Sequence, residues 1–212
     1  KPVPAASYRI ELNPGNIKID GNTLDYPSNG VIYVADDAVI SGKYSRSLTI
    51  AVSGNVTISG DLTIDKSGVE INGETITPTE TDPILGITTQ GNFILNCNGG
   101  GGKCEPRHLV GVFSAPAGTM YNDGWASAPI GAGDPPRIWI YGSVVTKNHP
   151  VFGSYTSVSN AEVTNGWAKS LKFDSRLLYA QPPYFFRTTQ ASVVRSAISV
   201  FPCTDAICRS GS

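Results

Sequence analysis

Residues 47–64 constrain the fold of this chain more than any other stretch, because apolar and polar residues alternate through them. The alternation is carried by three short runs: 48–52, 56–59 and 62–64. A period of two in β-branched residues is typical of half-buried strands. Small and polar residues interrupt it at 53–55 and 60–61, where they favour tight bends. The stretch therefore predicts three short strands separated by corners, about one coil of a β-solenoid.

The alternative to a solenoid is a hairpin meander, in which neighbouring strands run antiparallel. Tight hairpins favour dipeptides such as Asn-Gly, whose two residues both adopt φ > 0, between longer strands. The corners at 53–55 and 60–61 have the character of bends instead. We therefore favour the solenoid over the meander.

Similar short runs recur on both sides of this coil, and those that follow it end near Gly or Asn. They are 30–34, 38–42, 85–87, 92–95 and 137–142. Their spacing is irregular, so the chain has no strict hexapeptide or nonapeptide repeat. We expect an all-β protein, an irregular right-handed β-solenoid with long loops and an extended C-terminal tail.

This interpretation divides the chain into three parts. Residues 1–29 are expected to form N-terminal strands that cap the solenoid, with turn sequences at 13–15 and 20–22. Residues 30–186 form the solenoid itself, which at this size counts as one domain. Residues 187–212 form a C-terminal tail with a cysteine-bounded loop.

The composition is typical of extracellular β-proteins, with 16% charged residues, 23 Gly and 15 Pro in 212 residues. A net charge of −1 excludes a long-range field toward nucleic acid or an anionic membrane. The sequence holds no apolar stretch of about 18 residues and no signal segment. We expect a mature or excised piece of an extracellular or bacterial cell-surface protein.

The four cysteines form two close pairs in the sequence, Cys97 with Cys104 and Cys203 with Cys208. Four cysteines can pair in three ways, and these two pairs close the shortest loops. Disulfides indicate an oxidising compartment. The alternatives are four free thiols or a zinc site, although neither spacing is CxxC.

Metal and cofactor sites have little support in the sequence. His108 and His149 are not spaced as a ligand pair, and the acidic pair Asp36 and Asp37 lacks the repeated spacing of a calcium loop. We therefore expect neither a metal nor a cofactor.

An enzymatic reading is possible because parallel β-helices often cleave polysaccharides. Glycoside hydrolysis needs two carboxylates about 5 to 9.5 Å apart. The candidates are Asp61, Asp65, Glu70, Glu74, Asp123 and Asp134. They do not occupy equivalent positions of consecutive coils, and no nucleophile elbow or phosphate loop is present. We therefore expect no catalytic residues.

Four aromatic residues in loop-like segments are candidate contacts for a ligand or partner: Tyr121, Trp125, Tyr155 and Trp167. The first two lie in the long Gly- and Pro-rich stretch 116–136. A loop of that length is usually functional or mobile, and the alternative is an ordered cap over an open end of the solenoid.

The segment 173–186 differs from the rest, because Phe173, Leu177 and Leu178 have helical spacing and a pair of prolines then enforces an extended exit. The tail beyond it alternates again. Val193, Ala197 and Val200 are candidate subunit contacts on a strand that has no obvious partner within the solenoid.

The runs GVIYV, LTIAV, NVTI, DLTI and RIWIYGSVV and the ending FDSRLLYAQPPYFF together resemble the β-solenoid domain of unknown function found in bacterial PilX-like, pilus-assembly-type surface proteins. The resemblance covers residues 30–186 and is most specific at 174–186. Members of that family carry an N-terminal pilin-like anchoring helix, which this sequence lacks. The resemblance implies no catalytic residues.

Two functions follow as expectations. In the first, the chain is a non-enzymatic structural subunit or display module of a pilus or filament, which associates with itself or with pilus components. In the second, it is a surface adhesin that binds a glycan or DNA. A polysaccharide-cleaving β-helix enzyme is a third, weaker possibility.

Overall fold

The computed structural model describes residues 7–65, 78–96, 104–123, 136–155 and 163–185. Within these residues the chain forms strands and one 3-10 helix, η2 (Ser175–Leu178), which confirms the predicted all-β fold. The strands, in chain order, are β1 (Tyr8–Asn13), β2 (Asn16–Ile19), β3 (Asn22–Asp25), β4 (Val31–Val34), β5 (Ala38–Tyr44), β6 (Leu48–Val52), β7 (Val56–Ile64), β8 (Leu85–Thr89), β9 (Phe93–Asn96), β10 (Arg107–Ala115), β11 (Met120–Asp123), β12 (Arg137–Thr146), β13 (Gly153–Tyr155), β14 (Val163–Gly166) and β15 (Ala168–Phe173).

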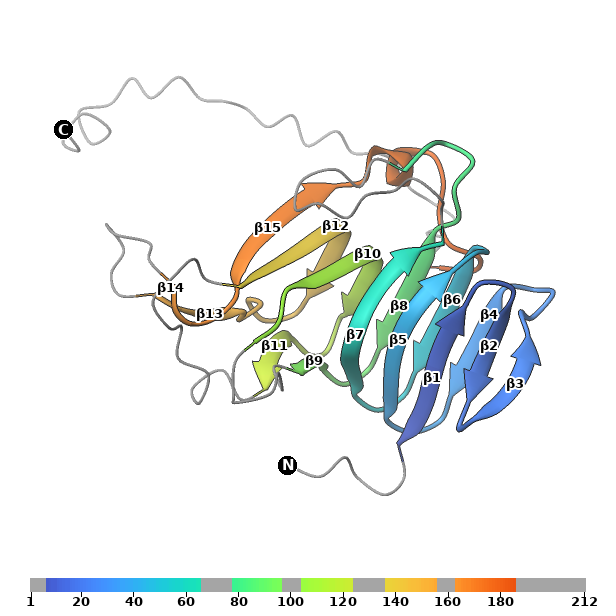
Figure 1. The fold of residues 1–212 in the computed structure, drawn as a ribbon, viewed down its shortest axis with the longest axis horizontal. Coiled ribbons are helices and arrows are strands. Elements are labelled where there is room, and N and C mark those ends of the chain that lie inside the picture. The colour runs from blue at the N-terminus through green and yellow to red at the C-terminus, as the bar shows by residue number, and fades with distance from the viewer. Residues whose placement is uncertain (1–6, 66–77, 97–103, 124–135, 156–162, 186–212) are drawn as a thin grey trace.

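One large mixed sheet contains all of these strands except β13 and β14, and it curls around a core (Figure 1). β1, β2 and β3 pair antiparallel across the turns predicted at 13–15 and 20–22. The other described pairs in this sheet are parallel. Because β1 also pairs with β5, the N-terminal strands belong to the same sheet as the strands that follow.

The parallel pairs form three series, which we call tracks. Track A joins β4, β6, β8 and the second halves of β10 and β12. Track B joins β1, the first halves of β5 and β7, then β9 and β11. Track C joins the second halves of β5 and β7, the first halves of β10 and β12, and β15. From β4 to β12 the chain visits the tracks in the constant order A, B, C.

The corner predicted at 60–61 does not separate two strands. β7 runs unbroken from Val56 to Ile64, and its pairing with β5 shifts in register between Ile40 and Gly42. Such an irregularity bends a strand without ending it, so β7 passes from track B to track C within one element. The corner predicted at 53–55 does separate β6 from β7.

Two glycines, which face each other in the pairing of β10 with β12, allow both strands to turn from track C to track A at the same position along the strands. Gly111 in β10 and Gly142 in β12 are paired and have φ of +144° and +145°. A Cβ atom on Gly142 would lie 1.8 Å from the backbone oxygen of Gly111. Only glycine accommodates both the backbone conformation and this contact.

A row of hydrogen bonds, the corner ladder, joins successive corners between tracks A and B. Asp37 Oδ1 accepts a hydrogen bond from the backbone N–H of Asn55 at 2.6 Å. Asn55 Oδ1 accepts one from the N–H of Asn92, and Asn92 Oδ1 accepts one from the N–H of Thr119, both at 3.0 Å. Each side chain thus satisfies a backbone donor that a corner would otherwise leave without a strand partner.

The core consists of apolar side chains stacked in rows between paired strands. The central members of these rows are fully buried: Ile50, Ile87 and Phe113 in track A, Ile40, Ile58 and Leu95 in track B, and Leu62, Leu109 and Ile140 in track C. Burying one such side chain contributes roughly 1.5–3 kcal/mol. The apolar residues of the alternating pattern in the sequence are therefore those that face the core.

Candidate functional site

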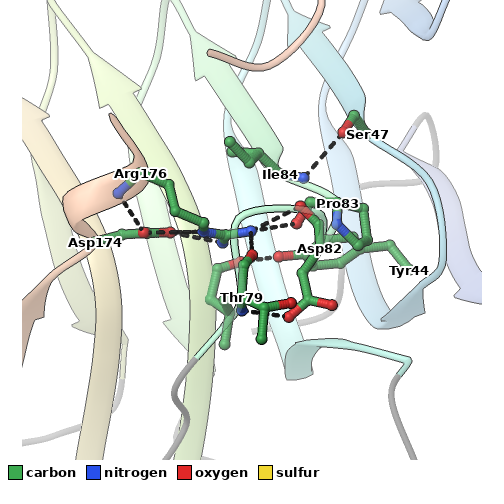
Figure 2. Close-up of polar contacts among 9 residues, drawn as sticks. Tyr44, Ser47, Thr79, Asp82, Pro83, Ile84, Asp174 and Arg176 are labelled. Carbon is green, nitrogen blue, oxygen red and sulfur yellow. Dashed lines mark hydrogen bonds and ion pairs between the residues drawn. The ribbon is translucent and has the colours of Figure 1, made fainter. Parts of the chain in front are cut away.

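The most densely bonded polar cluster in the described residues surrounds Arg176 in η2. Its Nε donates to both carboxylate oxygens of Asp174, at 3.0 and 3.1 Å, and its Nη2 donates to Asp174 Oδ2 at 2.6 Å. Both side chains are buried. We call the ion pair of Arg176 and Asp174 the clasp. The Nη1 of Arg176 also donates to the carbonyl oxygen of Asp82 at 2.7 Å, so the clasp ties η2 to the loop before β8 (Figure 2).

The clasp is a charge-assisted, bidentate pair, which is the strongest class of side-chain hydrogen bond. Burial alone lowers the pKa of the Arg176 guanidinium, but the hydrogen bonds and charge of Asp174 outweigh it and raise that pKa above its ordinary value. Nearby, burial strongly raises the pKa of Tyr44, whose phenol donates to the carbonyl oxygen of Val110 at 3.2 Å. The guanidinium is therefore engaged internally and Tyr44 stays neutral.

The residues after the clasp continue across the outer face of track A, and we call 174–185 the strap. The carbonyl oxygen of Pro183 accepts a hydrogen bond from Thr49 Oγ1 of β6. Phe185 is buried against Gly86 of β8, where an added Cβ would lie 2.5 Å from the ring. The clasp and these contacts hold the strap at both of its ends.

Between those two anchors the strap exposes large side chains. Leu178, Tyr179 and Tyr184 are all exposed, and they line a pocket of about 790 Å³ together with Leu177, Gln181, Pro182 and Pro183. Tyr184 also has a left-handed backbone, with φ of 53°. The sequence predicted helical spacing and an extended exit here. η2 supplies one helical turn, but the extended exit is wrong, because the chain turns after the prolines and the N–H of Phe185 donates to the carbonyl oxygen of Pro182 at 3.2 Å. The pocket was not foreseen.

The last strand of track C presents a second unusual surface. Leu171 of β15 pairs with Ile140, which pairs with Leu109, and that residue pairs with Leu62. The first three members of the row in chain order are buried, but Leu171 is exposed. Among the described residues β15 pairs with β12 alone, and Figure 1 shows it at one edge of the sheet. The row thus ends on an apolar side chain in contact with solvent.

The structure does not gather the four aromatic residues predicted as ligand contacts into one site. Trp167 is wrong as a surface contact, because its side chain is fully buried and its Nε1 donates to the carbonyl oxygen of Glu105 at 2.7 Å. Tyr121 lies half-buried in β11. Tyr155 ends β13, but its side chain is outside the description, and Trp125 lies outside the described residues.

Among the candidate carboxylates, Asp61 is held by His108. Asp61 Oδ1 accepts a hydrogen bond from the backbone N–H of His108 at 2.9 Å, and its Oδ2 lies 3.5 Å from His108 Nδ1. Burial tends to raise the pKa of the Asp61 carboxyl, but the hydrogen bonds from His108 prevail and lower it. The imidazole also stacks on Trp139, with ring centroids 4.5 Å apart.

The other carboxylates give no comparable site. Asp65 and Asp123 are exposed at strand ends, whereas Glu70, Glu74 and Asp134 lie outside the described residues. Within the described ranges, no group of three or more His, Cys, Asp or Glu side chains could hold a metal ion. No helix in the part of the chain that the structure describes is long and apolar enough to cross a membrane.

Cys104 is buried and is not a free thiol. Its predicted partner Cys97 lies outside the described residues, as do Cys203 and Cys208, so both pairings remain predictions. The tail positions Val193, Ala197 and Val200 also lie outside the described residues.

No protein-family model, curated protein or solved structure matches the chain. The arguments about function therefore rest on the residues themselves.

Sequence reasoning missed two features that position the strap and the coils. The clasp has a signal in the spacing of Asp174 and Arg176 before two prolines, but its burial depends on the distant loop 79–83. The corner ladder has a clearer signal, because Gly-Asn-Val at 54–56 is echoed by Gly-Asn-Phe at 91–93 and Gly-Thr-Met at 118–120. The third residue of each triplet is the first residue of a strand segment of track B.

Proposed function

We propose that this chain is a non-enzymatic, extracellular structural module, an irregular right-handed β-solenoid whose coils stack end to end with those of another copy. The three tracks and their constant order of use support a solenoid, because a coil that returns to the same side stacks its strand parallel to the previous one. Connections between parallel strands are right-handed in nearly all known cases. The antiparallel β1–β3 segment then forms the N-terminal end of the stack.

The observation that carries the proposal is the unfinished row at β15. Leu171 is 59% exposed although its row mates Leu62 and Leu109 are completely buried, and Phe173 in the same strand is 55% exposed. A sheet edge that also presents large apolar side chains is a template for pairing with another chain. An additional strand layered on β15 would bury both side chains.

The opposite end of the sheet offers a complementary edge on a second copy. β3 lies at the far end of the strand order from β15, and its residues are all exposed. β15 carries Lys169 and Lys172 and no acid, whereas β3 carries Asp25 and no base. Leu24 of β3 is exposed as well. Contact between two different surfaces of identical chains propagates into filaments when it does not close into a ring.

The proposal is tested by sedimentation velocity over a range of concentrations, followed by negative-stain electron microscopy. We expect the chain to form elongated oligomers that dissociate on dilution and at high salt, since salt screens charge pairs. A double change, Leu171→Asp with Phe173→Asp, should leave a folded monomer. The matched control is Leu178→Asp, which alters another exposed leucine, on the strap, and should still assemble. A wild-type chain that stays monomeric at every concentration would refute the proposal.

The extracellular part of the proposal rests on the composition and on the cysteines. Two disulfides are compatible with an oxidising compartment, and Cys104 is already engaged in the structure. Alkylation of the native protein without reductant, followed by intact-mass measurement, should add no label. Uptake of four labels would contradict both the disulfides and the compartment that they imply. The resemblance to pilus-associated proteins suggests a pilus or cell surface as the place of assembly.

A further inference from the structure

The pocket on the strap has features of a binding site that end-to-end assembly does not require. It has a volume of about 790 Å³, within the range of pockets that hold small ligands. Its most prominent side chains are exposed to an extent that is unusual for their size: 77% for Leu178, 63% for Tyr179 and 80% for Tyr184. Large apolar side chains that remain exposed together usually mark a contact surface.

The backbone around the pocket is fixed before any ligand binds. On one side the N–H groups of Tyr179 and Ala180 donate to the carbonyl oxygen of Arg176, at 3.1 and 2.8 Å, and the clasp holds Arg176 itself. On the other side Pro182 is buried and the N–H of Phe185 donates to the carbonyl oxygen of Pro182 at 3.2 Å. A site that is already ordered loses little conformational entropy on binding.

Tyr184 occupies a backbone conformation that tyrosine disfavours. A non-glycine residue at φ of 53° is strained, and such strain often occurs at functional sites. The conformation presents the ring to solvent, where it makes the residue the most exposed aromatic side chain in the described residues. A tyrosine at this position therefore neither relieves backbone strain nor adds to the buried core, so the stability of the fold does not explain it.

The chemistry of the lining residues selects the class of ligand. The lining residues that the structure describes are leucine, proline, tyrosine and glutamine, and none of them is charged. The guanidinium of Arg176, in the same strap, is buried and bonded to Asp174. A phosphate, a nucleic-acid backbone or an acidic peptide would find no cation among these described lining residues. A tyrosine ring offers an apolar face with a hydroxyl at its edge, and a glutamine amide both donates and accepts.

We propose that this pocket binds a neutral oligosaccharide. A pyranose ring has an apolar C–H face and a rim of hydroxyl groups, which match the ring faces of Tyr179 and Tyr184 and the amide of Gln181 respectively. Because Pro183 and Phe185 of the strap contact β6 and β8, the sugar is held at the outer face of track A.

The test is isothermal titration calorimetry of the whole protein with neutral gluco-, manno-, galacto- and N-acetylglucosamine oligosaccharides. We expect at least one series to bind. Tyr179→Ala and Tyr184→Ala should each weaken that binding by about tenfold or more, the scale of a lost contact residue. The matched control is Tyr33→Ala, which removes a tyrosine 69% exposed on β4 and should leave binding unchanged.

A second variant separates loss of binding from loss of folding. Tyr184→Gly removes the ring and relieves the positive φ, so it should abolish sugar binding while the unfolding midpoint stays level or rises. Equal loss of binding in Tyr33→Ala, or no binding of any neutral series, would overturn the proposal. So would a proline-rich peptide or a neutral phosphatidylcholine vesicle that binds through the same tyrosines while the sugars do not. Sedimentation of the same samples keeps the outcomes distinct, because a monomer that binds sugar supports this site and refutes assembly.

Discussion

At the scale of single residues, the clasp shows how one buried charge pair determines where a whole segment lies. Arg176 and Asp174 are two residues apart, yet the guanidinium also donates to the carbonyl oxygen of Asp82 in another loop. A buried pair of this kind adds little net stability relative to a well-packed apolar pair. Its effect is positional, because every donor and acceptor is satisfied in one arrangement of strap and loop.

Arg176→Ala is expected to lower the free energy of unfolding by about 3–5 kcal/mol, because it leaves the Asp174 carboxylate buried without its partner. Urea denaturation followed by tryptophan fluorescence measures this change. The double variant Arg176→Met with Asp174→Leu should be less destabilised than the single variant. If Arg176→Ala unfolds at the same urea concentration as the wild type, the guanidinium is not buried in solution.

The Asp61 carboxyl gives a second prediction, for the dependence of stability on pH. His108 lowers the pKa of Asp61 below its ordinary value of 3.8, so the folded state binds a proton less readily than the unfolded state. The resulting stabilisation is complete above that ordinary value and is lost as pH falls through the folded pKa. Asp61→Asn should therefore flatten the fall in unfolding free energy between about pH 5 and pH 3. An unchanged slope would show that His108 does not perturb this group.

At the scale of elements, the alternation in 48–52 predicted β6, and that in 56–59 and 62–64 predicted the two halves of β7, because a period of two reports which side chains face the core. That the two halves form one strand was not predicted, because the bend at 60–61 has the same local sequence character as a corner. The turns at 13–15 and 20–22 were also predictable from local chemistry. Trp167 was not, since it stands in a polar segment and its burial depends on contacts with residues far away in the chain, such as Glu105. The clasp escaped prediction for the same reason.

Gly142 provides a test of the corner between tracks C and A. Gly142→Ala should destabilise the protein by about 2–4 kcal/mol, because it combines a positive φ with a collision against the Gly111 backbone. Gly15→Ala is the matched control, since Gly15 also has a positive φ but no atom within 4 Å of an added Cβ. It should cost about 1–2 kcal/mol, the penalty of the backbone conformation alone. Thermal unfolding of the two variants compares them directly, and equal costs would argue against close contact at this corner.

At the scale of the whole molecule, the two ends of the track system differ. The N-terminal end is covered by β1, β2 and β3, which bury Ile17 and Tyr26, whereas the end at β15 leaves Leu171 and Phe173 exposed. Coils in such stacks contact only their neighbours, so an uncovered end behaves as one half of an interface. The described lining of the strap pocket includes no residue of β15, so a sugar and a second copy would have different contact residues.

The row Leu62, Leu109, Ile140 and Leu171 allows the uncovered end to be tested against the interior of the same stack. Leu62→Ala should lower the free energy of unfolding by about 2–5 kcal/mol, as expected for a cavity in a packed core. Leu171→Ala should change it by less than about 0.5 kcal/mol at concentrations where the protein is monomeric, since exposed side chains contribute little. The same Leu171→Ala variant should require a higher concentration to assemble, because the contact it removes lies between copies. If Leu171→Ala were as destabilising as Leu62→Ala in the monomer, the side chain would be covered within its own chain, and the end of the stack would already be closed.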